Sequence, residues 1–161
     1  MLVSEFNDGN QSVGAGADRH PQLAALEQLW ERKRVGAKLP SKTAFPPHEI
    51  RPWLGHVLLV DVDQNPVRFR VRLMGVNLVA YAGTDHTGRW LDEIFDPEQV
   101  KRLTAPHFKC LETKAPHYDV TAIIKDGSEK MLLHRVHLPC ADDGSTVNVI
   151  LGCAYAVKEA E

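Results

Sequence analysis

The chain has 161 residues, of which 43% are apolar and 25% are charged, and its formal net charge is -2 at pH 7. These values are typical of one globular domain and exclude a disordered or a fibrous chain. Because its 19 basic residues are balanced by 21 acidic ones, we expect no nucleic-acid partner, whose binding requires an excess of clustered positive charge.

Residues 1–18 mix Gly, Ser, Asn and Asp without periodicity, which predicts a flexible N-terminal tail before a single domain at 19–161. The odd number of cysteines, Cys110, Cys140 and Cys153, favours free thiols in a reducing compartment. No basic segment followed by an apolar run opens the chain, and no stretch has the roughly 18 apolar residues of a membrane span. We therefore expect a cytoplasmic protein without membrane contact.

The first predicted element is an amphipathic helix over residues 21–35, which begins at Pro21 and carries apolar residues at helical spacing. Its apolar stripe includes Leu23, Leu26 and Trp30. Such a stripe covers either the sheet of its own chain or the same helix of a second subunit. We assign these three residues to the partner surface of a homodimer, while the packing on the chain's own sheet stays open.

The next segment, Leu39–Pro52, contains four prolines and predicts a loop with at most one short turn. The apolar run His56–Val62 predicts a buried strand, and a turn at Asp63–Pro66 leads into a returning strand at Val67–Met74. A calcium loop at Asp61–Asn65 is excluded, because a proline follows where the sharp turn requires glycine and no glutamate stands at the twelfth position.

The strand Val67–Met74 alternates between apolar and charged residues, so its two faces are predicted to differ. The core face is expected to hold Val67, Phe69, Val71 and Leu73, and the outer face Arg68, Arg70, Arg72 and Met74. Arginines at alternate positions suit bidentate pairing with carboxylates or phosphates of a ligand or a partner protein. They also suit an edge strand that is kept soluble by charge. We assign the three arginines to the partner surface.

A helical middle follows the strand. Gly75 ends the strand, a helical pattern extends to Gly83, and a turn at Gly88 leads into apolar residues at 90–95. Asp96 and Pro97 form a helix start, and the helix is predicted to reach about Thr113.

Three strands are predicted to close the chain, at 118–125, 130–138 and 147–157. Asp126-Gly127 and Asp143-Gly144 are expected to form the turns between them. The predicted order is therefore a helix, two strands, a helical middle and three strands.

This order and several short motifs resemble the PAS fold, and in particular the single-domain PAS-like family common in alphaproteobacteria, over about residues 22–157. The motifs are Leu29-Trp30, Leu39-Pro40, Phe69-x-x-Arg72-Leu73-x-Gly75, Gly83-x-x-x-Thr87-Gly88 and Leu138-Pro139. Phe45-Pro46-Pro47 departs from the family, whose members often carry an acidic residue before the proline. The resemblance implies an α+β fold with a five-stranded antiparallel sheet, a helical middle and an N-terminal amphipathic helix.

The resemblance also implies sensing or protein interaction, with a ligand pocket between the sheet and the helical middle. The expected lining is Leu78, Tyr81, Trp90, Phe95, His107, Phe108, Cys110 and Leu111. The same side chains also suit an ordinary packed core, since large aromatic residues readily fill such a volume. The hypothesis is a sensory or regulatory module that binds a small ligand, a partner protein or both, as a homodimer.

No cofactor and no metal are expected. Haem sensors of this fold use a histidine on the long helix, where His107 lies with Cys110 one turn later, so a haem sensor is the alternative to a hydrogen-bonded core histidine. His134 and His137 are three residues apart on a strand and therefore point to opposite faces. A structural zinc requires four ligands, and no such set is present.

No catalytic residues are predicted, because no G-x-S-x-G elbow or comparable nucleophile motif occurs. We therefore predict that the protein is not an enzyme. The alternative in this class is a small α+β enzyme, such as an isomerase that uses a buried Asp and Tyr.

Overall fold

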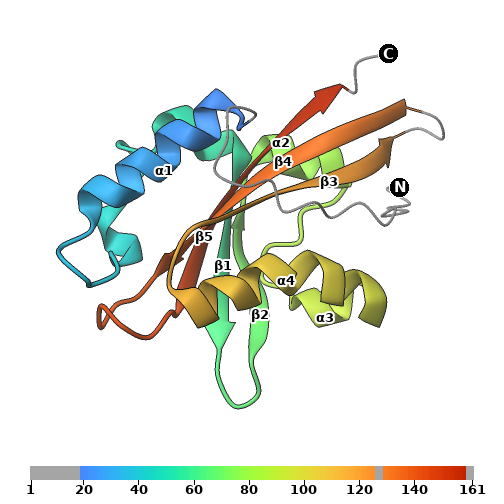
Figure 1. Ribbon diagram of the computed structural model, residues 1–161. Helices are drawn as coiled ribbons and strands as arrows, with labels where there is room; N and C mark the ends of the chain where they lie inside the picture. The colour runs from blue at the N-terminus through green and yellow to red at the C-terminus, as the bar shows by residue number, and fades with distance from the viewer. Residues whose placement is uncertain (1–18, 126–128, 159–161) are drawn as a thin grey trace.

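The computed structural model describes residues 19–125 and 129–158 (Figure 1). Its centre is a five-stranded antiparallel sheet with the strand order β2-β1-β5-β4-β3. The strands are β1 Val57–Asp63, β2 Arg68–Met74, β3 His117–Lys125, β4 Glu129–Cys140 and β5 Val149–Lys158. The predicted α+β class and antiparallel sheet are confirmed, whereas the tail at 1–18 and the turn at Asp126-Gly127 lie outside the described residues.

The helices are α1 Pro21–Lys33, α2 Val76–Ala82, α3 Leu91–Ile94 and α4 Pro97–Thr113. Two 3-10 helices, η1 Lys42–Ala44 and η2 Arg51–His56, lie in the segment between α1 and β1. The prediction of at most one short turn there was wrong. Pro52 does not disrupt η2, because it stands in the first turn, where a missing N–H costs no helical hydrogen bond.

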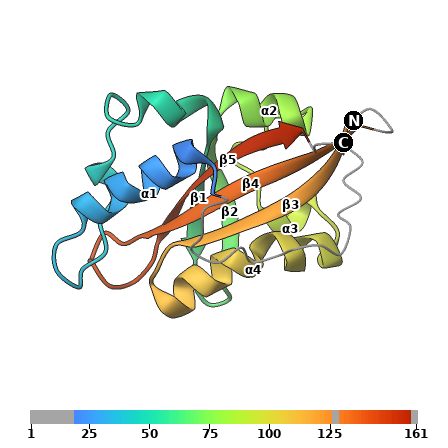
Figure 2. The same cartoon turned by 45° about the horizontal axis from the view of Figure 1, so that its top comes forward.

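α1 packs on the sheet of its own chain. Leu23, Leu26 and Trp30 are each 0% exposed, and Trp30 Nε1 donates a hydrogen bond of 2.9 Å to the carbonyl oxygen of Pro139 in β4. Figure 2 shows α1 lying along the sheet. This corrects the assignment of the three side chains to a partner surface: their burial within one chain leaves them no free face.

The other helices lie against the opposite face of the sheet. Neighbouring residues of a strand point to opposite faces, and Tyr118 and Asp119 of β3 show which element each face meets. Tyr118 Oη accepts a hydrogen bond from the backbone N–H of His20, at the start of α1. Asp119 pairs with Arg135 of β4, on the side where α4 contributes His107. The sheet is thus covered by α1 on one face and by α2–α4 on the other (Figures 1 and 2).

A β-bulge in β2 changes which residues face the helices. The register with β1 shifts so that Val71 and Leu73 pair with successive residues, which leaves Arg72 as the extra residue. Beyond the bulge the alternation is reversed: Leu73 is 40% exposed, and Met74 faces the helical middle. The prediction that Leu73 faces the core and Met74 faces solvent was therefore wrong.

The junction between β2 and α2 requires glycine. A Cβ atom on Gly75 would lie 2.4 Å from the backbone carbon and oxygen of Gly55 in η2, far inside van der Waals contact. The Gly75 N–H also donates to the carbonyl oxygen of Val57 at 2.8 Å. This close approach holds the start of α2 against η2 and so fixes one wall of the space between helices and sheet.

The long helix α4 begins at the predicted cap. The Asp96 side chain accepts from the Gln99 N–H, and the Gln99 side chain accepts from the Asp96 N–H, which together form a capping box. The helix ends at Thr113, as predicted, because Lys114 adopts a left-handed conformation. His107 therefore faces the sheet from the middle of a well-defined helix.

Candidate functional site

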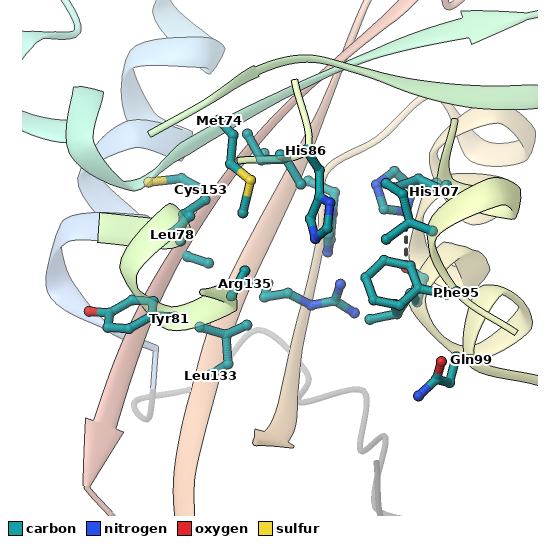
Figure 3. A pocket seen from close by; sticks show the side chains of 18 of the residues that line it. Met74, Leu78, Tyr81, His86, Phe95, Gln99, His107, Leu133, Arg135 and Cys153 are labelled. Carbon is teal, nitrogen blue, oxygen red and sulfur yellow. Dashed lines mark hydrogen bonds between the residues drawn. The ribbon is translucent and has the colours of Figure 1, made fainter. Parts of the chain in front are cut away.

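A cavity of about 520 Å³ lies between the sheet and α2–α4 (Figure 3). Its lining comes from four strands, from all three helices of this face and from the segment between α2 and α3. The lining residues are Leu58, Met74, Leu78, Tyr81, Ala82, Thr84, His86, Leu91, Ile94, Phe95, Gln99, Leu103, His107, Leu133, Arg135, His137, Gly152, Cys153 and Ala154. Most of these side chains are apolar, so the cavity favours an organic group over water.

The labelled nitrogen-bearing side chains of the cavity lie on its α4 side, whereas the Tyr81 hydroxyl lies at the α2 end. Figure 3 shows Met74, Leu78 and Leu133 toward α2, and His107 toward α4. The guanidinium group of Arg135 extends from the sheet toward the α4 end. The cavity therefore has a mainly apolar end and a polar end.

Under the polar end lies a buried ion pair. Arg135 Nε donates to Asp119 Oδ1 at 2.9 Å, and Arg135 Nη2 donates to Asp119 Oδ2 at 2.5 Å. Asp119 is 3% exposed and Arg135 is 8% exposed. Burial by itself raises the pKa of Asp119, but the charge of Arg135 and the hydrogen bond from His137 outweigh it and hold that pKa well below its ordinary value. The carboxylate is therefore ionised.

Two histidines adjoin this pair. His137 Nε2 lies 3.4 Å from Asp119 Oδ1, and the His137 and His107 ring centroids are 4.8 Å apart. Burial lowers the pKa of both, and for His107 the charge of Arg135, together with repulsion from His137 when that ring is protonated, lowers it further. Both rings are therefore neutral at pH 7.

The hydrogen bond of His107 fixes its tautomer. His107 Nδ1 lies 3.1 Å from the carbonyl oxygen of Leu103, and a carbonyl oxygen only accepts, so Nδ1 carries the proton. His107 Nε2 then has a lone pair, and no hydrogen-bond partner for it occurs among residues 19–125 and 129–158. Two other ring nitrogens of the lining, His86 Nδ1 and His137 Nδ1, are fully covered by protein and have no hydrogen-bond partner among the described residues.

Arg135 likewise retains one unused donor. Nε and Nη2 are bound to Asp119, while Nη1 has no hydrogen-bond partner in the described part of the chain and is not fully covered. The polar end, where His86 and Gln99 also line the cavity, thus offers Arg135 Nη1 as a donor and His107 Nε2 as an acceptor. This arrangement can bind a polar group of a ligand.

Four of the eight residues expected in the pocket line the cavity, namely Leu78, Tyr81, Phe95 and His107. Trp90 does not. Its ring lies under the Arg68 guanidinium, whose central carbon is 4.1 Å from the ring centroid, on the outer side of β2. This corrects its assignment to the pocket, because the β2 edge holds the ring outside.

Phe108, Cys110 and Leu111 also do not line the cavity. Phe108 is 48% exposed and meets the edge of the Phe69 ring. Cys110 is fully buried, and its Sγ donates to the carbonyl oxygen of His137 at 3.5 Å; Leu111 packs against the core. The sequence placed all three on one helical face with His107, but the side of α4 that reaches the cavity is narrower than that face.

The three arginines of β2 each have a partner within the chain. Arg68 forms two hydrogen bonds of 2.7 Å with Asp92. Arg70 Nε donates to the carbonyl oxygen of Gly88 at 3.0 Å. Arg72 Nε lies 2.8 Å from Asp61 Oδ1. These contacts account for the arginines without an external phosphate or carboxylate.

Sequence reasoning missed Arg135, Asp119 and His137 as a group. The available signal was the alternation of Arg135 and His137 within an apolar strand, which places both on one face. That they lie over the cavity, and that Asp119 of β3 stands beside Arg135, depends on the pairing of β3 with β4.

Among the described residues, only His107 is suited to bind a metal ion or a haem. The described residues include no group of three or more His, Cys, Asp or Glu that could hold a metal ion. His107 Nε2 would be the atom that binds a haem iron, since Nδ1 is held by a carbonyl. Cys110 is turned away from the cavity, and His117 Nε2 is bound to Thr113 Oγ1 at 2.7 Å, so neither supplies a second ligand.

Comparison with models of known protein families gives a match over most of the chain. A family model described as a PAS domain matches residues 18–155, from just before α1 into β5. No curated protein matches the chain. Within the described residues, no helix combines the length and the apolarity needed to cross a membrane.

Proposed function

Since the chain belongs to the PAS domain family, whose members are in general sensory or regulatory modules, we propose that it binds a small organic ligand between its sheet and α2–α4. The observation that carries this proposal is the cavity of about 520 Å³ with its mainly apolar lining. Protein interiors are normally packed to crystal-like density, so an unfilled volume of this size between the sheet and the helices favours a binding role. Pockets of roughly 300–1,000 Å³ are typical of small-molecule sites.

The chemistry of the site supports binding without turnover. Asp119 is engaged by Arg135 through both oxygens, so it is a poor proton acceptor. The cysteines are no better as nucleophiles, because burial raises the pKa of Cys110, Cys140 and Cys153 to about 12. These features favour a non-enzymatic module over a small isomerase.

We further propose that a signal leaves the domain through contact with another protein or a second copy. The buried face of α1 is engaged within the chain, so such a contact uses other surfaces, for which the exposed arginines Arg70 and Arg72 are candidates. Light scattering over a range of concentrations tests the homodimer. A monomer mass that persists at high concentration contradicts it.

Binding of a neutral apolar fluorophore, N-phenyl-1-naphthylamine, tests the ligand proposal directly. We expect saturable fluorescence enhancement with the wild-type protein. Leu133→Trp fills the cavity and should weaken this binding at least about tenfold, which corresponds to about 1.4 kcal/mol. The matched control is Leu132→Trp, on the same strand but on the opposite face. Both variants are first checked for folding by circular dichroism, and saturable binding that survives Leu133→Trp unchanged contradicts the proposal.

Haem is the second candidate, favoured by the unpartnered Nε2 of His107. An absorption spectrum of the haem-reconstituted protein distinguishes haem binding from binding of another organic ligand. We expect no Soret band. A Soret band that His107→Ala removes would replace the organic ligand with haem.

A further inference from the structure

The polar end of the cavity presents a donor and an acceptor as a pair. Arg135 Nη1 donates and belongs to a side chain that is 90% covered, with 10% of its surface exposed. His107 Nε2 accepts, because Nδ1 carries the proton, and the residue is 2% exposed. Both residues line the cavity, and neither atom has a hydrogen-bond partner among the described residues, so a ligand can supply both partners.

A carboxyl group supplies both an acceptor for Arg135 Nη1 and a proton for His107 Nε2. One of its oxygens accepts from Arg135 Nη1, while the other shares a proton with His107 Nε2. A hydroxyl offers a single oxygen for both contacts. An ammonium group only donates, so it would leave Arg135 without an acceptor and bring a second positive charge beside the guanidinium.

Charge balance limits the ligand to a monoanion. Arg135 and Asp119 neutralise each other, and the two adjoining histidines are neutral. An ionised carboxylate that enters this end is neutralised by one proton from solvent, which comes to lie between the carboxylate oxygen and His107 Nε2. A phosphate dianion would need two protons next to the Asp119 carboxylate, so it fits less well.

The other end of the cavity determines the rest of the ligand. Leu58, Met74, Leu78 and Leu133 line it, and Figure 3 places the labelled members of this group away from His107. Burying an alkyl chain there removes apolar surface from water, which favours binding.

We propose that the ligand is an organic monocarboxylic acid whose carboxyl group binds Arg135 and His107 and whose apolar body lies toward α2. This rests on the proposed ligand-binding function and specifies its chemistry. The acid is bound with one proton that the free carboxylate lacks at neutral pH. The charged and titratable groups that face this proton are His107, His137, Arg135 and Asp119, and His86 also lines the same cavity.

The test compares octanoate, octanol and octylamine, which share one chain length, by calorimetry at pH 7. We expect octanoate to bind at least about tenfold more tightly than octanol, as a charge-assisted hydrogen bond provides, and octylamine to show no binding. Titration in buffers of different ionisation enthalpy should show uptake of about one proton per octanoate. Octanol should bind without proton uptake.

Two variants assign the roles. Arg135→Lys keeps a positive charge beside Asp119 but loses the planar fork, so we expect octanoate affinity to fall at least about tenfold while octanol affinity is unchanged. His107→Phe keeps the ring volume and should abolish the proton uptake. The matched control is His117→Phe, whose ring lies outside the cavity; its affinity and proton uptake should equal those of the wild type.

Each alternative outcome contradicts a specific part of the proposal. Equal affinity for octanoate and octanol, or proton uptake that persists in His107→Phe, overturns the carboxylic-acid inference. If N-phenyl-1-naphthylamine still binds, the ligand-binding function stands. If neither the fluorophore nor any of the three alkyl probes binds, the proposed function fails as well.

Discussion

Arg135 and Asp119 face each other across β4 and β3, joined by two parallel hydrogen bonds of 2.9 and 2.5 Å beside the cavity. Such a pair adds little net stability when it replaces apolar residues, because both ions lose their hydration. It does fix the orientation of the guanidinium group, and with it the position of Nη1, which has no hydrogen-bond partner among residues 19–125 and 129–158.

Removing one partner of this pair should be costly. Asp119→Ala leaves the Arg135 charge buried and unpaired, so we expect a loss of about 3–5 kcal/mol in the free energy of unfolding, measured with urea. The exposed pair of Asp61 and Arg72, with side chains 29% and 42% exposed, is the control: Asp61→Ala should cost less than about 1 kcal/mol. Equal losses in the two variants would contradict the structure.

Stability should decrease as the pH falls below about 6.5, the ordinary histidine value. The pKa values of His107 and His137 are lowered by folding, so between the folded and unfolded pKa the unfolded chain binds more protons and is favoured. His20, His86, His117 and His134 act in the same direction.

The lowered pKa of Asp119 adds a second loss of stability below about pH 4, where the unfolded carboxylate is protonated before the folded one. Urea midpoints at pH 8, 6, 5 and 4 measure both effects. His107→Phe should reduce the slope between pH 7 and 5, and a wild-type midpoint that is constant from pH 8 to 5 would be inconsistent with buried neutral histidines.

A substitution at Trp30 tests whether α1 packs on the sheet of its own chain in solution. Trp30→Ala removes a fully buried ring and the hydrogen bond to Pro139, so we expect a loss of about 3–5 kcal/mol that does not depend on protein concentration. Gln28→Ala, on the exposed side of the same helix, should change stability by less than about 0.5 kcal/mol. A loss that disappears at high concentration would instead indicate packing between subunits.

The bulge at Arg72 makes opposite predictions for two neighbouring residues. Leu73→Ser replaces a side chain that is 40% exposed, so it should change the free energy of unfolding by less than about 0.5 kcal/mol. Met74→Ser alters the cavity lining and should weaken binding of N-phenyl-1-naphthylamine. Without the bulge the two effects would be exchanged.

Gly75→Ala should disturb the wall formed by α2. The added Cβ would lie 2.4 Å from the Gly55 backbone, and relieving this contact should cost about 1–3 kcal/mol, as for other overpacked sites. Val76→Ala is the control, because Val76 is 76% exposed. A stable Gly75→Ala protein with unchanged fluorophore binding would show that α2 and η2 are not in close contact.

Much of the fold could be predicted from local patterns. The capping residues Asp96 and Pro97 fixed the start of α4, and alternating or continuous apolar runs located all five strands within a few residues of their observed bounds. These signals are local, since caps, turns and periodicity depend on residues only a few positions apart. Each family motif is likewise a short local pattern, although the fold joins two of them over a long range, through the hydrogen bond from Trp30 to Pro139.

The site could be predicted only in part. His107 and Tyr81 were located because helical spacing points them toward the sheet, but strict alternation assigned Met74 to the wrong face, since a bulge of one residue reverses it. Trp90 is as apolar as the residues that do line the cavity, and only its contact with Arg68 places it outside.

The sequence alone therefore determined the order and type of the elements and the residues that α1 buries. The tertiary structure decided that α1 covers its own sheet and that a cavity remains between the sheet and α2–α4. It also decided that Arg135, Asp119 and His107 meet at one end of that cavity. The physical reason is the distance along the chain between the residues involved. Periodicity depends on close neighbours in the sequence. Burial, pairing across strands and unfilled volume depend on residues far apart in the sequence that the fold brings together.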